Sequence, residues 1–357
     1  MKPCYSLTTL VGIIACLPTF ACAQESSRLY FPSERRWERI EPGKAGWDSK
    51  KLKTALMYAK DSKSSGVVIL LNGRILAERH WEPVDTSPRY RRMTTGKSAA
   101  GHNIEDVASC QKSIVSIMVG IAQEKKLLKL SDRASKYLDK GWSRASARQE
   151  SQITIRHLLT MTSGLTSTLE YEAPPGSKWR YNTSSYAHCL RIVCKASGKD
   201  EATVTKEWIT EPLEMTDSRW IPRRASGKNE FGFATTVRDL ARFGLMIQNR
   251  GKWADKTVIA DQSYLKQALS PSQKLNQSYG YLWWLNNPKT GKGRRPIPNA
   301  PRDLVGAYGS LARRCYVVPS AGLVVTRLGD EPNDKNEFQT EFWRLLREAA
   351  PKTRDRR

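Results

Sequence analysis

The sequence of 357 residues is poor in histidine and in acidic side chains, and these shortages exclude several functions. Four histidines are present, and none of them forms a Cys/His cluster with the spacing of a zinc site. No G-x-S-x-G elbow occurs, which argues against an α/β-hydrolase with a Ser-His-Asp triad. After residue 23 no stretch approaches the roughly 20 apolar residues that a membrane-spanning helix needs. We therefore expect no metal and no cofactor, and we interpret His157 as a structural histidine.

Basic residues exceed acidic ones by 59 to 35, which gives a formal net charge of +24. Short basic clusters occur, one of them at Arg89, Arg91 and Arg92, but no nucleic-acid motif accompanies them, so we expect no specific nucleic-acid partner. An anionic envelope surface is an alternative partner, and a solvated basic face without any specific partner is another.

The N-terminus has the pattern of an export signal. Lys2 supplies a positive start, an apolar run extends from Leu7 to Phe20, and the small residues at 21–23 predict cleavage before Gln24. We expect residues 1–23 to be a signal peptide and the mature protein to be periplasmic or secreted, with an uncleaved anchor as the alternative. The four later cysteines are expected to be small buried hydrophobic residues: Cys110, Cys189, Cys194 and Cys315.

The two ends of the mature chain predict similar structure. Asp48 caps a helix with apolar residues at helical spacing, and Asn72-Gly73 then joins two β-rich runs as a hairpin. Near the C-terminus, strands at 314–318 and 323–328 precede an amphipathic helix, whereas the middle of the chain is mostly helical. We predict an α+β fold, in which one antiparallel sheet is flanked by N- and C-terminal helices and a mostly helical region is inserted. The sheet domain would comprise residues 24–98 and 299–357, and the helical domain residues 99–298.

The chemistry centres on an S-x-x-K motif, Ser109 to Lys112, at the start of a predicted helix. Residues three apart on a helix share a face, so the lysine amine can reach the serine hydroxyl. A lysine that loses its water shifts toward the neutral amine and accepts a proton. Alone, this short motif also fits a solvated surface lysine by chance.

Two further segments strengthen the hypothesis. Tyr181 lies in a loop at a helix entrance, where its phenol could relay a proton to the leaving group. Gly309 and Ser310 precede a strand, and the N–H groups of Ser310 and Ser109 together would bind an oxyanion. Taken individually, an ordinary loop tyrosine and a β-bulge glycine are alternatives.

In combination, these blocks resemble the serine β-lactamase and penicillin-binding-protein superfamily over residues 45–345. The branch with the greatest similarity is related to class C β-lactamases and includes esterases, D-aminopeptidases and 6-aminohexanoate-dimer hydrolases. The resemblance implies that Ser109 is the nucleophile, Lys112 its partner, Tyr181 the tyrosine of the Y-x-N element and Gly309 the glycine of the K-T-G-like element.

Two positions depart from the family pattern. Thr183 stands where the family has asparagine, unless Asn182 takes over through a local shift. Ala307 replaces the lysine or histidine that helps to hold the substrate carboxylate in β-lactamases, with Arg313 or Arg314 as possible substitutes. We therefore predict a serine hydrolase acting on an ester, amide or peptide. The alternatives are a β-lactamase or D-Ala-D-Ala peptidase, and a non-catalytic binder of envelope glycopeptide.

Overall fold

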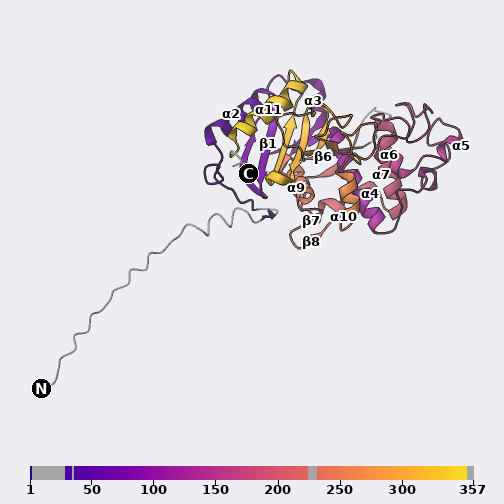
Figure 1. Cartoon of the computed structure of the whole chain (residues 1–357), viewed down its shortest axis with the longest axis horizontal. Helices are drawn as coiled ribbons and strands as arrows, with labels where there is room; N and C mark the ends of the chain where they lie inside the picture. The colour runs from indigo at the N-terminus through magenta and orange to yellow at the C-terminus, as the bar shows by residue number, and fades with distance from the viewer. Residues whose placement is uncertain (2–28, 34–35, 224–230, 352–357) are drawn as a thin grey trace.

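The computed structural model describes residues 1, 29–33, 36–223 and 231–351 (Figure 1). Apart from residue 1, the predicted signal peptide and its cleavage point therefore lie outside the described residues. Within these ranges, no helix has the length and apolar character needed to cross a bilayer.

The main sheet is antiparallel and joins the two ends of the chain, as predicted. Its strand order is β2-β1-β12-β11-β10-β9, so the N-terminal hairpin pairs with the C-terminal one through β1 and β12. The Asn72-Gly73 turn has positive φ at both residues, which explains its side-chain choice. The strands are β1 (Ser64–Leu71), β2 (Arg74–His80), β9 (Trp284–Leu285), β10 (Val305–Gly309), β11 (Arg313–Val318) and β12 (Leu323–Gly329).

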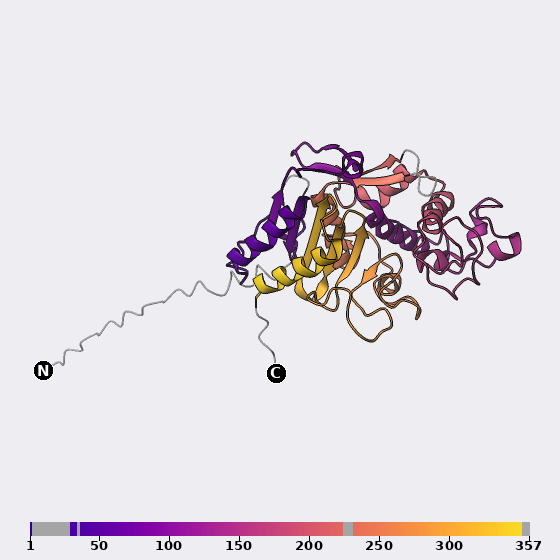
Figure 2. The ribbon, with the colours of Figure 1, turned by 90° about the horizontal axis from the view of Figure 1, so that it is seen from above.

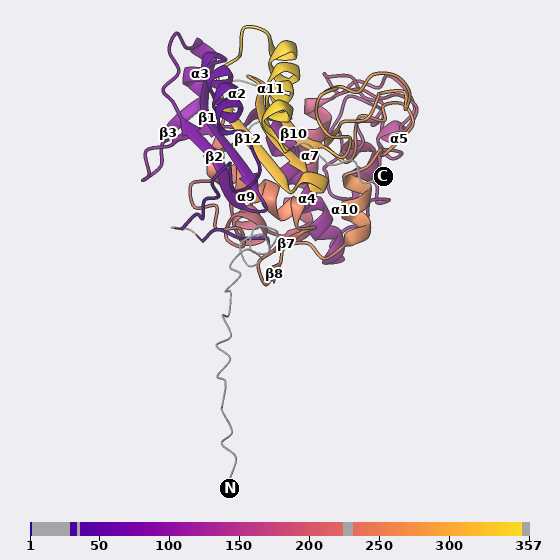
Figure 3. The same cartoon turned by 60° about the vertical axis from the view of Figure 1, so that its left-hand side comes forward.

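Helices cover both faces of this sheet. α2 (Ser49–Asp61) and α11 (Lys335–Ala349) lie side by side on one face (Figure 3). Asp48 caps α2 as predicted, because its carboxylate accepts hydrogen bonds from the N–H groups of Lys50 and Lys51. α9 (Val237–Gln248) belongs to the region expected to be a helical domain, but it packs against β11 and β12 on the opposite face.

A second sheet, which the sequence analysis missed, lies beside the main one with the order β3-β4-β6-β5. Its strands are β3 (Thr94–Lys97), β4 (Asn103–Asp106), β5 (Arg219–Pro222) and β6 (Phe231–Thr235), while β7 (Lys252–Trp253) and β8 (Lys256–Thr257) form a separate pair. The predicted border after residue 98 falls between the paired strands β3 and β4, and the division into domains stays a prediction.

The helical region lies to one side of the sheets, at the end away from α2 and α11 (Figure 2). Its central member, α4 (Gln111–Glu124), is buried from Gln111 to Ala122 and contacts both α7 and β10. The remaining helices are α3 (Pro88–Met93), α5 (Ala147–Glu150), α6 (Ile155–Leu159), α7 (Thr183–Ser197), α8 (Glu201–Thr205) and α10 (Gln262–Ala268). His157 completes the capping box of α6, which confirms its structural role.

Candidate active site

The S-x-x-K motif occupies a tight turn that leads into α4. Ala108 to Cys110 form a short 3-10 helix, and α4 follows directly from Gln111. Ala108 has a φ of 52°, a left-handed conformation that is uncommon for a residue with a Cβ. Its N–H donates to the Asp106 carboxylate at 2.8 Å, which holds the turn in place. Ser109 is consequently half-buried, with its hydroxyl at the edge of a cleft.

The Lys112 amine donates a hydrogen bond to the Ser109 hydroxyl at 2.8 Å, one helical turn away. Lys112 is only 2% exposed, although the sequence places it on the polar side of the helix. Burial, with a smaller effect from the positive charge of Arg223, lowers the pKa of Lys112 to about 7. A substantial fraction of this amine is therefore neutral near pH 7 and able to accept a proton.

Two aromatic rings enclose the amine. The Lys112 nitrogen lies 5.1 Å from the ring centre of Tyr181 and 4.4 Å from that of Tyr186, and both contacts favour the charged form. Burial raises the pKa of Tyr181 to about 12, and a hydrogen-bonding interaction with Ser109 opposes this shift. The structure thus brings Ser109, Lys112 and Tyr181 together, with the phenol of Tyr181 held neutral. Tyr186 is a core residue whose hydroxyl accepts a hydrogen bond from the side chain of Gln111.

The start of α7 and the end of β10 both border the cleft. A Cβ on Gly309 would lie 2.2 Å from the carbonyl oxygen of Val107, so glycine is needed because the nucleophile turn packs directly on this strand. The absence of a side chain at this position therefore makes room for the chain's own backbone. The sequence alone did not reveal this requirement. Ser310 follows at the strand end and lines the cleft with Ser109. Ala307 is buried, and its carbonyl accepts a hydrogen bond from the Cys110 thiol.

Of the two residues considered for the family asparagine, Thr183 lines the cleft. Asn182 caps α7 instead: its side-chain oxygen accepts from the N–H of Ser185. Its side-chain nitrogen donates to the carbonyls of Leu165 and Thr166. Both N–H donors of the carboxamide are therefore used within the fold, and Asn182 could donate to a substrate only by losing one of these bonds.

Neither arginine proposed as a substitute for the missing charge at Ala307 lines the cleft. Arg313 is fully buried and pairs with the Glu105 carboxylate at 3.0 Å. Arg314 points to the other face of β11, where it donates to the carbonyl of Gly309 and lies 4.8 Å from the ring centre of Tyr308. Successive side chains of a strand point to opposite faces, which separates the two arginines. Each of them binds groups of the fold itself.

The cleft itself has a volume of about 800 Å³ and contains basic residues that sequence reasoning did not place there. Arg89 and Arg92 come from α3, and Arg223 from the end of β5. The basic cluster at residues 89–92 was visible in the sequence, but nothing local indicated that it faces the nucleophile. The link between α3 and this cleft depends on contacts between residues far apart in the chain.

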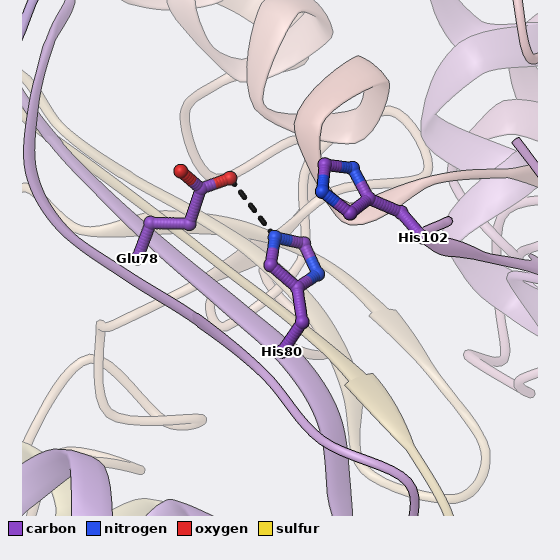
Figure 4. A group of neighbouring side chains, drawn as sticks. All are labelled: Glu78, His80 and His102. Atoms are coloured by element: carbon purple, nitrogen blue, oxygen red, sulfur yellow. Dashed lines mark hydrogen bonds and ion pairs between the residues drawn. The ribbon is translucent and has the colours of Figure 1, made fainter. Parts of the chain in front are cut away.

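A possible metal-binding group lies elsewhere, at the edge of the main sheet (Figure 4). Side-chain atoms of Glu78, His80 and His102 lie within 4.8 Å of one another. The Glu78 carboxylate, however, already binds Arg39, Arg238 and His80. The two imidazole rings are stacked 3.7 Å apart and nearly parallel, so their in-plane lone pairs do not converge on one ion. These residues form a charge network, and their donor set does not fit a metal in this arrangement.

Comparison with known proteins agrees with this fold. The Beta-lactamase family model matches residues 54–349, and the chain therefore belongs to that family. A protein assigned as a 6-aminohexanoate-dimer hydrolase in Bacillus anthracis has a similar fold, with a TM-score of 0.64, 17% identity, and coverage of 90% of this chain and 87% of that one. A beta-lactamase/D-alanine carboxypeptidase from Yersinia pestis gives a TM-score of 0.61 at 17% identity, covering 84% of this chain and 98% of that one.

In sequence, the chain is similar to the D-alanyl-D-alanine-carboxypeptidase/endopeptidase AmpH of Escherichia coli, at 26% identity over 159 residues. The match covers 36% of this chain and 41% of that protein. The predicted superfamily and fold class are thereby confirmed, whereas the substrate is not determined by these similarities.

Proposed function

We propose that this protein is a serine hydrolase that cleaves an ester or amide through an acyl-enzyme on Ser109. The observation that carries the proposal is the 2.8 Å hydrogen bond between the Lys112 amine and the Ser109 hydroxyl, inside a pocket that removes water from the amine. No carboxylate of the described residues pairs with Lys112, so burial prevails over the two aromatic contacts and lowers the pKa of the amine.

Each catalytic group has a distinct role in this proposal. Neutral Lys112 takes the proton of Ser109 while the serine oxygen attacks the substrate carbonyl. The N–H groups of Ser109 and Ser310 receive the oxyanion. The neutral phenol of Tyr181, beside both groups, passes a proton to the leaving alcohol or amine. Water then attacks the acyl-enzyme, the reverse proton path releases Ser109, and the net reaction is hydrolysis.

An ester or amide is favoured over a β-lactam because the position that would hold the β-lactam carboxylate is the buried residue Ala307. A β-lactamase or D-Ala-D-Ala peptidase activity, related to those named for the similar proteins, is the alternative. We further propose that the protein acts outside the cytoplasm, on the basis of the export-signal pattern in residues 1–23.

The test is intact-mass spectrometry after incubation with a fluorophosphonate, a nitrophenyl ester, a penicillin and a D-Ala-D-Ala peptide. We expect the fluorophosphonate and the ester to add mass to the peptide that carries Ser109, and Ser109→Ala to abolish both additions. Ser116→Ala is the matched control, since this serine is buried two turns along and contacts Tyr264. A wild-type protein that accepts no probe would overturn the proposal and favour a non-catalytic binder.

A further inference from the structure

The cleft beside Ser109 carries two guanidinium groups from one short helix. Arg89 and Arg92 are three residues apart on α3, so they share one side of it, and both line the cleft. Arg89 donates to the hydroxyl of Ser310 at 2.8 Å, which brings its charge beside the proposed oxyanion site. Arg92 has no hydrogen bond or ion pair within the ranges that the structure describes.

α3 is held in position by a buried contact of Tyr90 and by part-buried contacts of its capping residue. The hydroxyl of Tyr90 donates to the Glu105 carboxylate at 3.1 Å. Ser87, which caps the helix, donates to Asp330 through its N–H at 2.6 Å and its hydroxyl at 2.8 Å. Because the helix is anchored in this way, the backbone positions from which the two exposed arginines reach the cleft are fixed. Arg91, between them, binds the carbonyl of Thr86 and does not line the cleft.

The cleft has no acidic group free to neutralise these charges. Asp106 is the one acidic residue that lines it among the described residues, and Arg223 binds both of its oxygens at 2.7 Å. Arg313, the nearest alternative cation considered from sequence, is itself neutralised by Glu105. The cleft therefore carries an excess of two positive charges from Arg89 and Arg92, before any charge on Lys112 is counted.

We propose that Arg89 and Arg92 form an anion-binding subsite that selects substrates with a carboxylate near the scissile ester or amide. This inference rests on the proposed hydrolase function and names its substrate class. The guanidinium fork matches the two oxygens of a carboxylate, which a lysine ammonium does not. The subsite comes from α3 and is independent of position 307, so it would hold a carboxylate at a different place from the one that β-lactamases use.

The test compares three esters on the full chain: nitrophenyl butyrate, mono-nitrophenyl glutarate with a carboxylate on its acyl group, and carboxy-nitrophenyl butyrate with one on its leaving group. We expect one anionic ester to exceed the neutral ester in kcat/KM by about tenfold, the effect of one charge-assisted contact. Which ester is preferred tells which side of the carbonyl the subsite serves. Raising the ionic strength from about 0.01 M to about 1 M should reduce the preference, because the Debye length falls from about 30 Å to about 3 Å.

Variants assign the preference to residues. Arg92→Gln and Arg89→Gln should each lower the anionic-to-neutral ratio about threefold, which is half of a tenfold effect on a logarithmic scale. Arg91→Gln removes the same charge from the same helix and should leave the ratio unchanged. Equal use of all three esters by the wild type, or equal ratios in Arg92→Gln and Arg91→Gln, would overturn the subsite while leaving the hydrolase proposal intact.

A binding measurement separates the two proposals when no ester is turned over. Calorimetry on Ser109→Ala, which forms no acyl-enzyme, compares the affinity for mono-nitrophenyl glutarate with that for nitrophenyl butyrate. Tighter binding of the anionic ester that is lost on adding Arg92→Gln supports the subsite, even if the hydrolase proposal has failed. The affinity for carboxy-nitrophenyl butyrate is measured in the same way, and equal affinity for the neutral ester and both anionic esters contradicts the subsite.

Discussion

Two polar clusters in this protein bury charge in opposite ways. At the sheet edge, the Glu78 carboxylate is 3% exposed, and two arginines and His80 satisfy both of its oxygens. Burial acts to raise the pKa of Glu78, but the bonds from His80 and Arg238 prevail and hold that pKa well below its ordinary value. At the cleft, Lys112 is equally buried, yet its amine contacts a neutral hydroxyl and two aromatic rings, and no carboxylate of the described residues pairs with it.

The difference shows which buried charge stabilises the fold and which is available for chemistry. A carboxylate surrounded by cations contributes to the stability of the fold, and it stays ionised near pH 7. Burial without a counter-ion destabilises the charged form of an amine, so the amine can act as a base at neutral pH. The two clusters should therefore respond to substitution in opposite ways.

The largest effect is expected for Lys112→Met. Removal of the base should slow the second-order labelling of Ser109 by a fluorophosphonate about 10³-fold, within the usual range for a general base. The melting temperature should stay equal or rise, because an apolar side chain replaces a buried amine without a counter-ion. Lys112→Arg should be equally slow, since a guanidinium keeps its proton. Retention of wild-type labelling in either variant would contradict the role of Lys112.

Glu78→Gln should have the opposite effect, a loss of stability with an unchanged labelling rate. Breaking a buried ion pair costs about 3–5 kcal/mol, but Arg39 and Arg238 are partly exposed and regain water, so we expect a loss of about 2 kcal/mol. Denaturant unfolding measures this loss, and the fluorophosphonate labelling rate of the folded variant should match that of the wild type. A slowed labelling rate with unchanged stability would mean that the two clusters are not separate.

The labelling rate of the wild type should depend on pH through Lys112. Its pKa is lowered to about 7, so the neutral amine forms as the pH rises through this value and is lost below it. We expect the rate to fall about tenfold per pH unit below the midpoint and to level off above it. A pH-independent rate between pH 5 and pH 9, roughly two units on either side of the midpoint, would contradict this assignment.

The smallest effect concerns His102, stacked on His80 beside Glu78. Burial, aided by the charges of His80 and Arg238, lowers the pKa of His102 to about 4. The unfolded chain takes up this proton near pH 6.5, so stability should decline as the pH falls from about 6.5 to about 4. We expect His102→Phe, which keeps a ring in the stack, to reduce this decline by about 1 kcal/mol after solvent screening.

The buried His188, whose pKa is also lowered to about 4, contributes to the same decline. The corresponding variant His188→Phe therefore serves as the comparison, and unfolding curves at several pH values measure each share. An acid decline that His102→Phe leaves unchanged would show that this ring does not titrate as expected.

Much of the fold was predictable because its signals are local. The cap at Asp48 and the Asn72-Gly73 turn are each set by a few neighbouring residues, and the structure confirms both. Thr236 likewise caps α9 by accepting a hydrogen bond from the N–H of Asp239, whose own carboxylate binds Ser218. The second sheet was missed because β4 and β6 are short strands that depend on pairing between distant residues.

The sequence by itself determined which reactive groups stand one helical turn apart, because the spacing of Ser109 and Lys112 needs nothing beyond a helix. Only the tertiary structure decided that the amine is buried without a counter-ion, and that Tyr181 and Gly309 meet the same turn. It also decided that Arg89 and Arg92 face the nucleophile while Arg313 is neutralised by Glu105. Burial and charge pairing are properties of the neighbours that long-range packing brings together, and no local pattern encodes them.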